Sequence, residues 1–130
     1  MQAAVYSRWG AVSSLVALIP QASLYYGDSP RDSAYPQCVF TITNGSPSFA
    51  FGQRHIEFAL LEFFAMDDSS SSAVISAAAR EITIGFDDAS LTYAAGVTHM
   101  ALYRVGGEEL TRTGLVWRHV VPYEVRVNAL

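Results

Sequence analysis

The sequence predicts an α+β fold: a single, mostly antiparallel β-sheet with an N-terminal helix and a mid-chain helix packed on one face, and a long C-terminal β-hairpin. Three observations lead to this prediction. Residues 115–127 alternate apolar and polar side chains, which is the period of a strand. Residues 2–19 repeat apolar residues at spacings of three and four, which is the period of a helix. Residues 73–84 follow a run of serines that can cap a second, alanine-rich helix. The 130 residues suit one domain, 1–130.

The N-terminal part reads as a helix, a connector and a strand. The helix over residues 2–19 ends at Pro20, and its apolar stripe consists of Val5, Trp9, Val12, Val16 and Ile19. Residues 24–36 are rich in turn residues and form the connector. Pro36 favours extended geometry at the residue before it, so a strand over residues 38–43 follows.

Residues 49–66 form the second long strand. Both of its faces are partly apolar, which is typical of a strand covered on both sides. A helix over residues 56–66 is the alternative, because Glu, Leu, Ala and Met also favour helix. Gly85 is expected to close the mid-chain helix, and residues 91–93 form a short extended piece.

The C-terminal part predicts an antiparallel pair. A strand over residues 97–105 is followed by the break Gly106-Gly107 and by a polar loop or flared hairpin tip at residues 108–113. Gly114 opens the final strand, whose odd positions are expected to be buried. Its wetter face carries Arg118 and Arg126.

The composition points to apolar surface that other subunits cover. The chain is 51% hydrophobic and 15% charged, against about 25% charged in average domains. Either the core is unusually full or neighbours hide apolar surface, and we favour the second. The net charge of −4 argues against nonspecific nucleic-acid binding. No run approaches the roughly 18 apolar residues of a membrane span, so no membrane partner is expected.

The residues that could carry chemistry are two acidic pairs, three histidines and one cysteine: Asp67-Asp68, Asp87-Asp88, His55, His99, His119 and Cys38. The acidic pairs lack the spacing of a calcium loop, and helix capping and turn formation explain both. The histidines could converge on zinc across a sheet, but their spacing favours half-buried strand positions. The cysteine lies in an apolar strand and is expected to be a buried small hydrophobe. We therefore expect no cofactor, no metal and no enzymatic activity.

Charged residues near the C-terminal hairpin form the predicted interface. Glu108, Glu109 and Arg112 are either a solvated tip or an arm that docks on a neighbouring subunit, with Arg118 and Arg126 as its partners.

Residues 44–53 contain Gly, Ser and Pro and form either a hairpin loop or a partner-binding arm. Phe49, Phe51 and Arg54, in or beside this segment, complete the predicted interface.

Two short motifs carry a family resemblance. The connector contains Tyr26-Gly27-Asp28-Ser29-Pro30, and Tyr35-Pro36 begins the next strand. With the order of helix, connector, long strand, mid-chain helix and terminal hairpin, the chain resembles the tail terminator, or tail completion, proteins of long-tailed bacteriophages and gene transfer agents. The resemblance covers nearly the whole chain, although residues 44–52 depart from the smooth strand-to-strand link of that family.

The resemblance implies a structural role in the virion tail or neck, after assembly in the host cytoplasm. Family members form a homo-oligomeric ring, usually a hexamer, at the head-proximal end of the tail tube. The ring stops tube polymerisation and joins the tail to the head connector. The family resemblance implies three partners: the chain itself, the tail tube protein and a connector or stopper protein. Genomic DNA passes through the lumen without specific binding, and the family has no catalytic residues.

Two other functions stay open. The chain could be another phage head–tail connector, such as a stopper or head-completion protein. From a different class, it could be a small-molecule-binding α+β module. The oligomeric state distinguishes a ring-forming virion protein from a binding module, because the first assembles and the second is a monomer or dimer.

Overall fold

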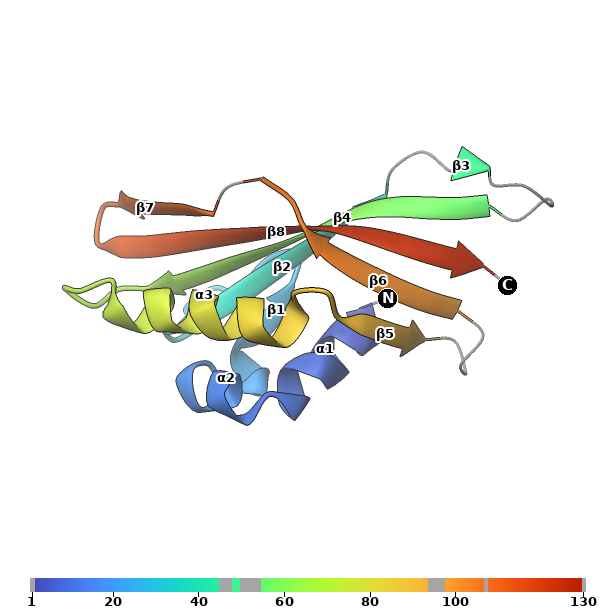
Figure 1. Ribbon diagram of the computed structural model, residues 1–130. Helices are drawn as coiled ribbons and strands as arrows, with labels where there is room; N and C mark the ends of the chain where they lie inside the picture. Colours follow the sequence, from blue (N-terminus) through green and yellow to red (C-terminus); the bar gives the residue numbers. More distant parts are fainter. Residues whose placement is uncertain (1, 45–47, 50–54, 94–97, 107, 130) are drawn as a thin grey trace.

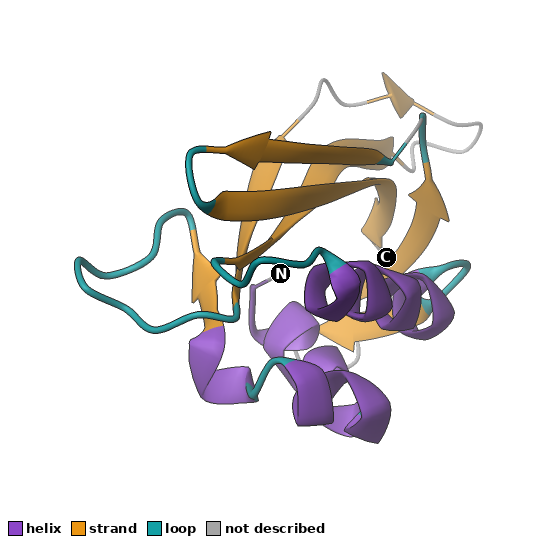
Figure 2. Ribbon diagram, turned by 90° about the vertical axis from the view of Figure 1, so that its left-hand side faces the viewer, coloured by secondary structure: helices purple, strands orange, loops and turns teal. Residues whose placement is uncertain are grey.

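The computed structural model describes residues 2–44, 48–49, 55–93, 98–106 and 108–129. Within these ranges it has helices α1 (Gln2–Ala11), α2 (Ser13–Leu18) and α3 (Ala73–Phe86), with a 3-10 turn, η1 (Gln21–Ser23). The strands are β1 (Leu24–Tyr26), β2 (Gln37–Asn44), β3 (Ser48–Phe49), β4 (His55–Asp67), β5 (Ser90–Tyr93), β6 (Thr98–Arg104), β7 (Glu109–Thr113) and β8 (Val116–Ala129). The helices lie on one side of the sheet (Figure 1 and Figure 2), which confirms the predicted α+β fold. No helix in the described part is long and apolar enough to cross a membrane.

The sheet is built around the pair of its two longest strands, β4 and β8. The strand order is β1-β2-β4-β8-β6-β5, with β3 paired to β4 and β7 paired to β8. Only the β1–β2 pair among those described is parallel. The antiparallel register of β4 and β8 runs from Ile56 opposite Asn128 to Asp67 opposite Trp117. The strand predicted over residues 49–66 is thus correct for its longer part, and the helical alternative is wrong.

One side of β8 is shared by two partners. Strand β6 pairs with residues 123–129, and β7 pairs with residues 116–120. Pro122 lies between them, and its carbonyl accepts a hydrogen bond from the Val105 N–H at 3.1 Å. The N–H and C=O of one strand residue point to the same side, so the proline nitrogen faces the gap between β6 and β7. A proline is tolerated in this central strand because no ladder hydrogen bond is lost there.

The hairpin therefore differs from its prediction in one respect. Residues 108–113 were expected as a polar loop or flared tip, but residues 109–113 form strand β7 and pair with β8. The residues of β7 do not alternate between buried and exposed positions, since both faces of this strand are largely exposed. The sequence therefore lacks the alternation that predicts a strand here. Pairing with the long strand β8 makes the strand.

The N-terminal helix is interrupted, which corrects the single helix predicted over residues 2–19. Val12 is extended, with φ −97° and ψ 92°, and separates α1 from α2. In a straight helix, Trp9 and Ile19 would lie about 15 Å apart along the axis. The break turns the chain back, so the Trp9 indole N–H donates to the Ile19 carbonyl at 3.0 Å. Both side chains are fully buried as a result.

Gly85 lies inside α3 and does not close it, contrary to the prediction. The helix continues to Phe86, with Asp87 as its C-cap. Gly85 is buried, and a Cβ built on it would lie 2.9 Å from the Val12 Cγ2. Its carbonyl accepts a hydrogen bond from the Arg8 Nε at 2.8 Å. The glycine thus permits close contact between α3 and the N-terminal helices.

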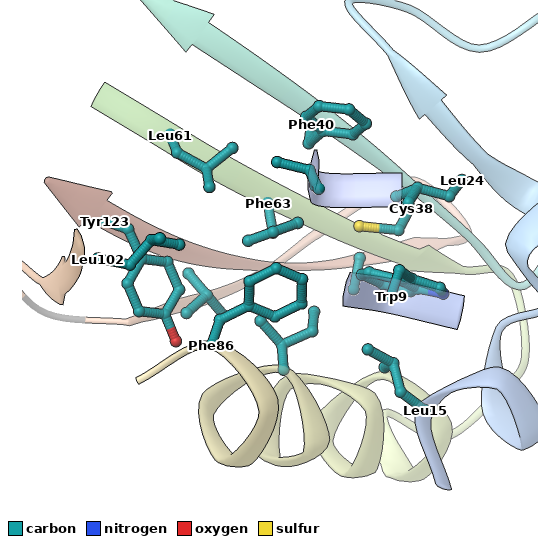
Figure 3. Close-up of a cluster of buried hydrophobic side chains, with 14 of the residues drawn as sticks. Trp9, Leu15, Leu24, Cys38, Phe40, Leu61, Phe63, Phe86, Leu102 and Tyr123 are labelled. Atoms are coloured by element: carbon teal, nitrogen blue, oxygen red, sulfur yellow. The ribbon is translucent and has the colours of Figure 1, made fainter. Parts of the chain in front are cut away.

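The core fills the space between the sheet and the helices (Figure 3). Odd-numbered residues of β4 point into it and are buried: Ala59, Leu61, Phe63 and Ala65. The aromatic rings at its centre contact one another, and the Phe63 and Phe86 centroids are 4.8 Å apart. Val121, Tyr123 and Val125 of β8 face the same side, which confirms the predicted buried face of the final strand for these residues.

Candidate interaction surface

The face of the sheet turned away from the helices carries an unusual share of apolar side chains. Even-numbered residues of β4 and β8 lie on it in cross-strand pairs: Phe58 with Arg126, Leu60 with Glu124, Glu62 with Pro122, Phe64 with Val120, and Met66 with Arg118. We call this surface the open face. Leu60 is 37% exposed, and Tyr103 of β6 is 42% exposed. The helices of the described part of the chain lie on the other side of the sheet (Figure 1).

Arginines on the open face stack on aromatic rings. The Arg118 guanidinium lies 5.5 Å from the Phe64 ring centroid. The Arg126 guanidinium lies 4.8 Å from the Tyr103 ring and 5.8 Å from the Phe58 ring. Stacking holds a guanidinium by attraction to the ring quadrupole and leaves N–H donors for another partner. The sequence placed Arg118 and Arg126 on the wetter strand face, and the structure exposes both there.

A hollow of about 310 Å³ opens on this face. It is lined by Gly27, Asp28, Val39, Thr41, Phe64, Met66 and Arg118. Of these residues, only Arg118 was a predicted site residue. The hollow combines a turn with three strands that are distant in sequence, so the register of β2, β4 and β8 had to be known before it could be found.

The β7–β8 hairpin bears the remaining predicted charges that the structure describes. Glu109 pairs in register with Val120, on the open-face side, whereas Arg112 pairs with Trp117, on the other side. The Arg112 guanidinium lies 5.0 Å from the Trp117 ring centroid. Leu115 was predicted on the buried face of the final strand, but it lies in the turn before β8 and is 74% exposed. Arg112 and Arg118 thus belong to opposite faces, and docking of the hairpin on a neighbour stays a prediction.

Glu108 already has partners within its own chain. Its Oε1 accepts a hydrogen bond from Arg104 at 2.6 Å, and its Oε2 lies 2.9 Å from the His119 Nε2. Arg104 also pairs with Asp87 at 3.3 Å, and the Tyr123 hydroxyl donates to Asp87 at 2.6 Å. These five side chains link the end of α3, the end of β6 and the centre of β8. The sequence named Glu108 but missed the intrachain partners that engage it.

Two side chains in this set of contacts, Tyr123 and Arg104, have raised pKa values. Burial, together with the hydrogen bond to Asp87, raises the pKa of the Tyr123 hydroxyl well above its usual range. The attraction of Asp87 raises the pKa of the Arg104 guanidinium. Both shifts move the two pKa values further above the physiological range, in which Tyr123 is neutral and Arg104 is charged.

The other residues that could carry chemistry are buried, hydrogen-bonded within the chain or far from one another. Cys38 is fully buried, and burial raises the pKa of its thiol, so it is the small buried hydrophobe that was predicted. The carboxylate of Asp67 accepts hydrogen bonds from the Asp68 N–H and the Ser69 hydroxyl, a local turn. Among the described residues, no three His, Cys, Asp or Glu side chains form a metal-binding group.

The strand register also separates His99 from His119. His99 pairs with Asn128 of β8, and His119 lies nine residues earlier on the same strand. Nine residues of strand span about 30 Å, so these two histidines do not share one site.

The segment that includes residues 45–47 and 50–54 is only partly described. Phe49 lies in β3, opposite His55, but its side chain is outside the described residues. Phe51 and Arg54 are also outside them. Their part in the predicted interface stays a prediction.

Comparison with known proteins gives a likeness of fold. A chain from the virion of a native gene transfer agent (GTA) particle matches with a TM-score of 0.76 and 19% sequence identity, over 99% of this chain and 95% of that one. A second solved structure, of a protein named without a function, matches with a TM-score of 0.53 and 14% identity, over 100% of this chain and 96% of that one. No protein-family model and no curated protein matches the sequence. At these identities the likeness concerns the fold.

Proposed function

We propose that this chain is a structural virion protein, and more specifically a ring-forming tail terminator at the head-proximal end of a tail tube. The observation that carries the proposal is the open face. It presents Phe58, Leu60, Phe64 and Met66 with stacked arginines, and the described part of the chain offers nothing to cover it. A surface of this kind suits a subunit whose neighbours supply the missing layer.

The likeness to a GTA virion chain supports the same proposal, because it extends over 99% of this chain and 95% of the other. A virion is an assembly of protein chains, so a chain with this fold can serve as one of its parts. In the proposal, this chain contacts further copies of itself, most simply as a hexamer, together with a tail tube protein and a head–tail connector or stopper protein. Assembly takes place in the host cytoplasm, and the mature location is the tail or neck of the virion.

The proposed role is mechanical and requires no enzymatic step. The Cys38 thiol is buried, and Asp87 and Glu108 are engaged in hydrogen bonds and ion pairs within the chain. The net charge of −4 suits a ring whose lumen DNA passes without binding. Replacing exposed acids by arginine in assembled rings should slow DNA passage, and unchanged passage would show that acids do not line the lumen.

The decisive experiment is deletion of the gene from the genome that encodes the particle, followed by electron microscopy of the products. If the chain is a tail terminator, tails grow to uncontrolled length and fail to join heads. If it is a stopper or head-completion protein, tails keep their normal length and heads lose DNA. Normal particles in the deletion strain would refute a structural virion role of either kind.

A further inference from the structure

The outer face of α3 carries one large apolar side chain between two charged residues. Exposed residues recur along α3 at spacings of four, three and four: Ala73, Ala77, Arg80 and Ile84. Ile84 is 63% exposed, although the other isoleucines of this helix, Ile75 and Ile82, are fully buried. Arg80 precedes Ile84 by four residues and Asp88 follows it by four, in the turn after the helix.

Neither charge has an ion-pair partner in the part of the chain that the structure describes. The Arg80 side chain makes no hydrogen bond there, since only its backbone carbonyl accepts one, from Thr83. Asp88 is exposed as well. The stripe is thus ordered as a base, an isolated apolar residue and an acid.

The hollow on the open face has the opposite order. Asp28 stands at its edge beside β1, Phe64 and Met66 form its apolar floor, and Arg118 closes it on β8. The Asp28 carboxylate accepts one hydrogen bond, from the neighbouring Ser29 N–H at 2.9 Å. Arg118 stacks on Phe64 and has no ion pair among the described residues. The hollow therefore offers an acid, an apolar floor and a base.

The dimensions of the two surfaces agree. From β1 across β2 and β4 to β8 there are three strand spacings of about 4.8 Å, or roughly 14 Å. The helical rise of about 1.5 Å per residue gives roughly 12 Å from Arg80 to the turn at Asp88. A helix that lies across the strands can thus bring each charge to its opposite, with Ile84 between them.

We propose that α3 of one copy of this chain docks in the hollow of a second copy. Ile84 contacts Phe64 and Met66, Arg80 pairs with Asp28, and Asp88 pairs with Arg118. The contact cannot form within one chain, because α3 covers the buried face of the sheet (Figure 1), whereas the residues that line the hollow lie on the opposite face.

Because the two surfaces differ, the contact is head-to-tail, and each copy has both halves. Such contacts generate a ring when the rotation closes and a filament when it does not. The inference rests on the proposed function for the ring, but the contact itself can be tested on the purified chain alone.

The test measures self-association of the full chain by sedimentation velocity and native mass spectrometry over a series of concentrations. Arg80→Glu and Asp28→Arg should each weaken association about tenfold or more, because each places like charges together. The combined variant keeps the net charge of the natural chain and should recover most of the loss. Ile84→Glu should also weaken association while leaving the thermal midpoint of the monomer unchanged, since the side chain is exposed.

Ser7→Glu is the matched control for Ile84→Glu. It also replaces a neutral exposed residue by glutamate, but on α1, outside the hollow and the stripe on α3, and it should associate as the natural chain does. Equal loss in this control, or no recovery in the combined Arg80/Asp28 variant, would overturn the proposal. So would a natural chain that stays monomeric at every concentration.

The results also distinguish failure of the proposed α3 contact from failure of the proposed virion function. If the natural chain forms a ring that Ile84→Glu and the charge reversals leave intact, the contact is wrong and the ring stands. The deletion experiment tests the virion role independently, because its readout is tail length and not the surface used for assembly.

Discussion

Replacing Gly85 with alanine tests whether close packing against Val12 is the reason for glycine in α3. In an ordinary helix interior, this change stabilises by about 1 kcal/mol, because glycine is a poor helix former. Here the new methyl would lie 2.9 Å from the Val12 Cγ2. Valine is stiff at χ1, so the clash must move the helices apart. Overpacking costs about 1–3 kcal/mol, so after the gain in helix propensity we expect a net loss of up to about 2 kcal/mol.

The second variant makes this prediction specific. Val12→Ala alone should cost about 1 kcal/mol, because the side chain is only half-buried. With both changes, the alanine at position 85 fits into the space that Val12 vacates. The free energy of unfolding of the double variant should therefore equal or exceed that of Val12→Ala. Urea unfolding of the four proteins, at one low protein concentration, gives the values. Losses that add within about 0.5 kcal/mol would refute the packing explanation.

Three further predictions concern buried groups. Tyr123→Phe removes the hydrogen bond to Asp87 and should cost about 1–2 kcal/mol in urea unfolding. Because the folded pKa of Tyr123 is raised, its contribution is complete below about pH 10 and is lost as pH rises above it; the unfolding free energy of the natural chain should fall there more steeply than that of Tyr123→Phe. Trp9→Ala empties the centre of the core and loses the bond to the Ile19 carbonyl, so thermal unfolding should show a loss of about 3–5 kcal/mol. Cys38, fully buried with a raised thiol pKa, should resist a thiol-labelling reagent until urea is added, and rapid labelling of the native chain would contradict its burial.

The sequence predicted the elements whose pattern repeats over many residues. The alternation over residues 115–127 identified the buried face of β8 at Val121, Tyr123 and Val125. A long strand shows its two-residue alternation clearly, because many residues fit the same pattern. The start of the mid-chain helix at Ala73 was predicted because a run of serines precedes it, whereas its end lies two residues beyond the predicted one.

The elements that the sequence missed depend on contacts between distant residues. The break at Val12 does not interrupt the apolar period, because Val12 and Val16 continue the stripe of α1. Only the burial of Ile19 beside Trp9 requires the turn. Gly85 has the same character: glycine near the end of a helix suggests a stop, and its real role needs the position of α2.

The candidate site was predicted in its residue types more than in its arrangement. The sequence placed Arg118 on an exposed strand face, but its neighbours in the hollow come from strands whose order could not be read along the chain. Glu108 was expected to reach outward, and the fold instead brings Arg104 and His119 to it. A local pattern cannot show which oppositely charged residue will be nearest.

The place of Pro122 has a consequence for how this protein can change. Strands β6 and β7 are separate partners of β8, and between them Pro122 offers only its carbonyl, which accepts from the Val105 N–H directly after β6. Residues can therefore be added to or removed from the connector that joins them without shifting the register of β6. The hairpin can then lengthen or shorten as a module, while the core beneath β6 keeps its packing. A protein engineer could graft loops or tags at this boundary, and evolution could fit the same body to differently shaped partners there.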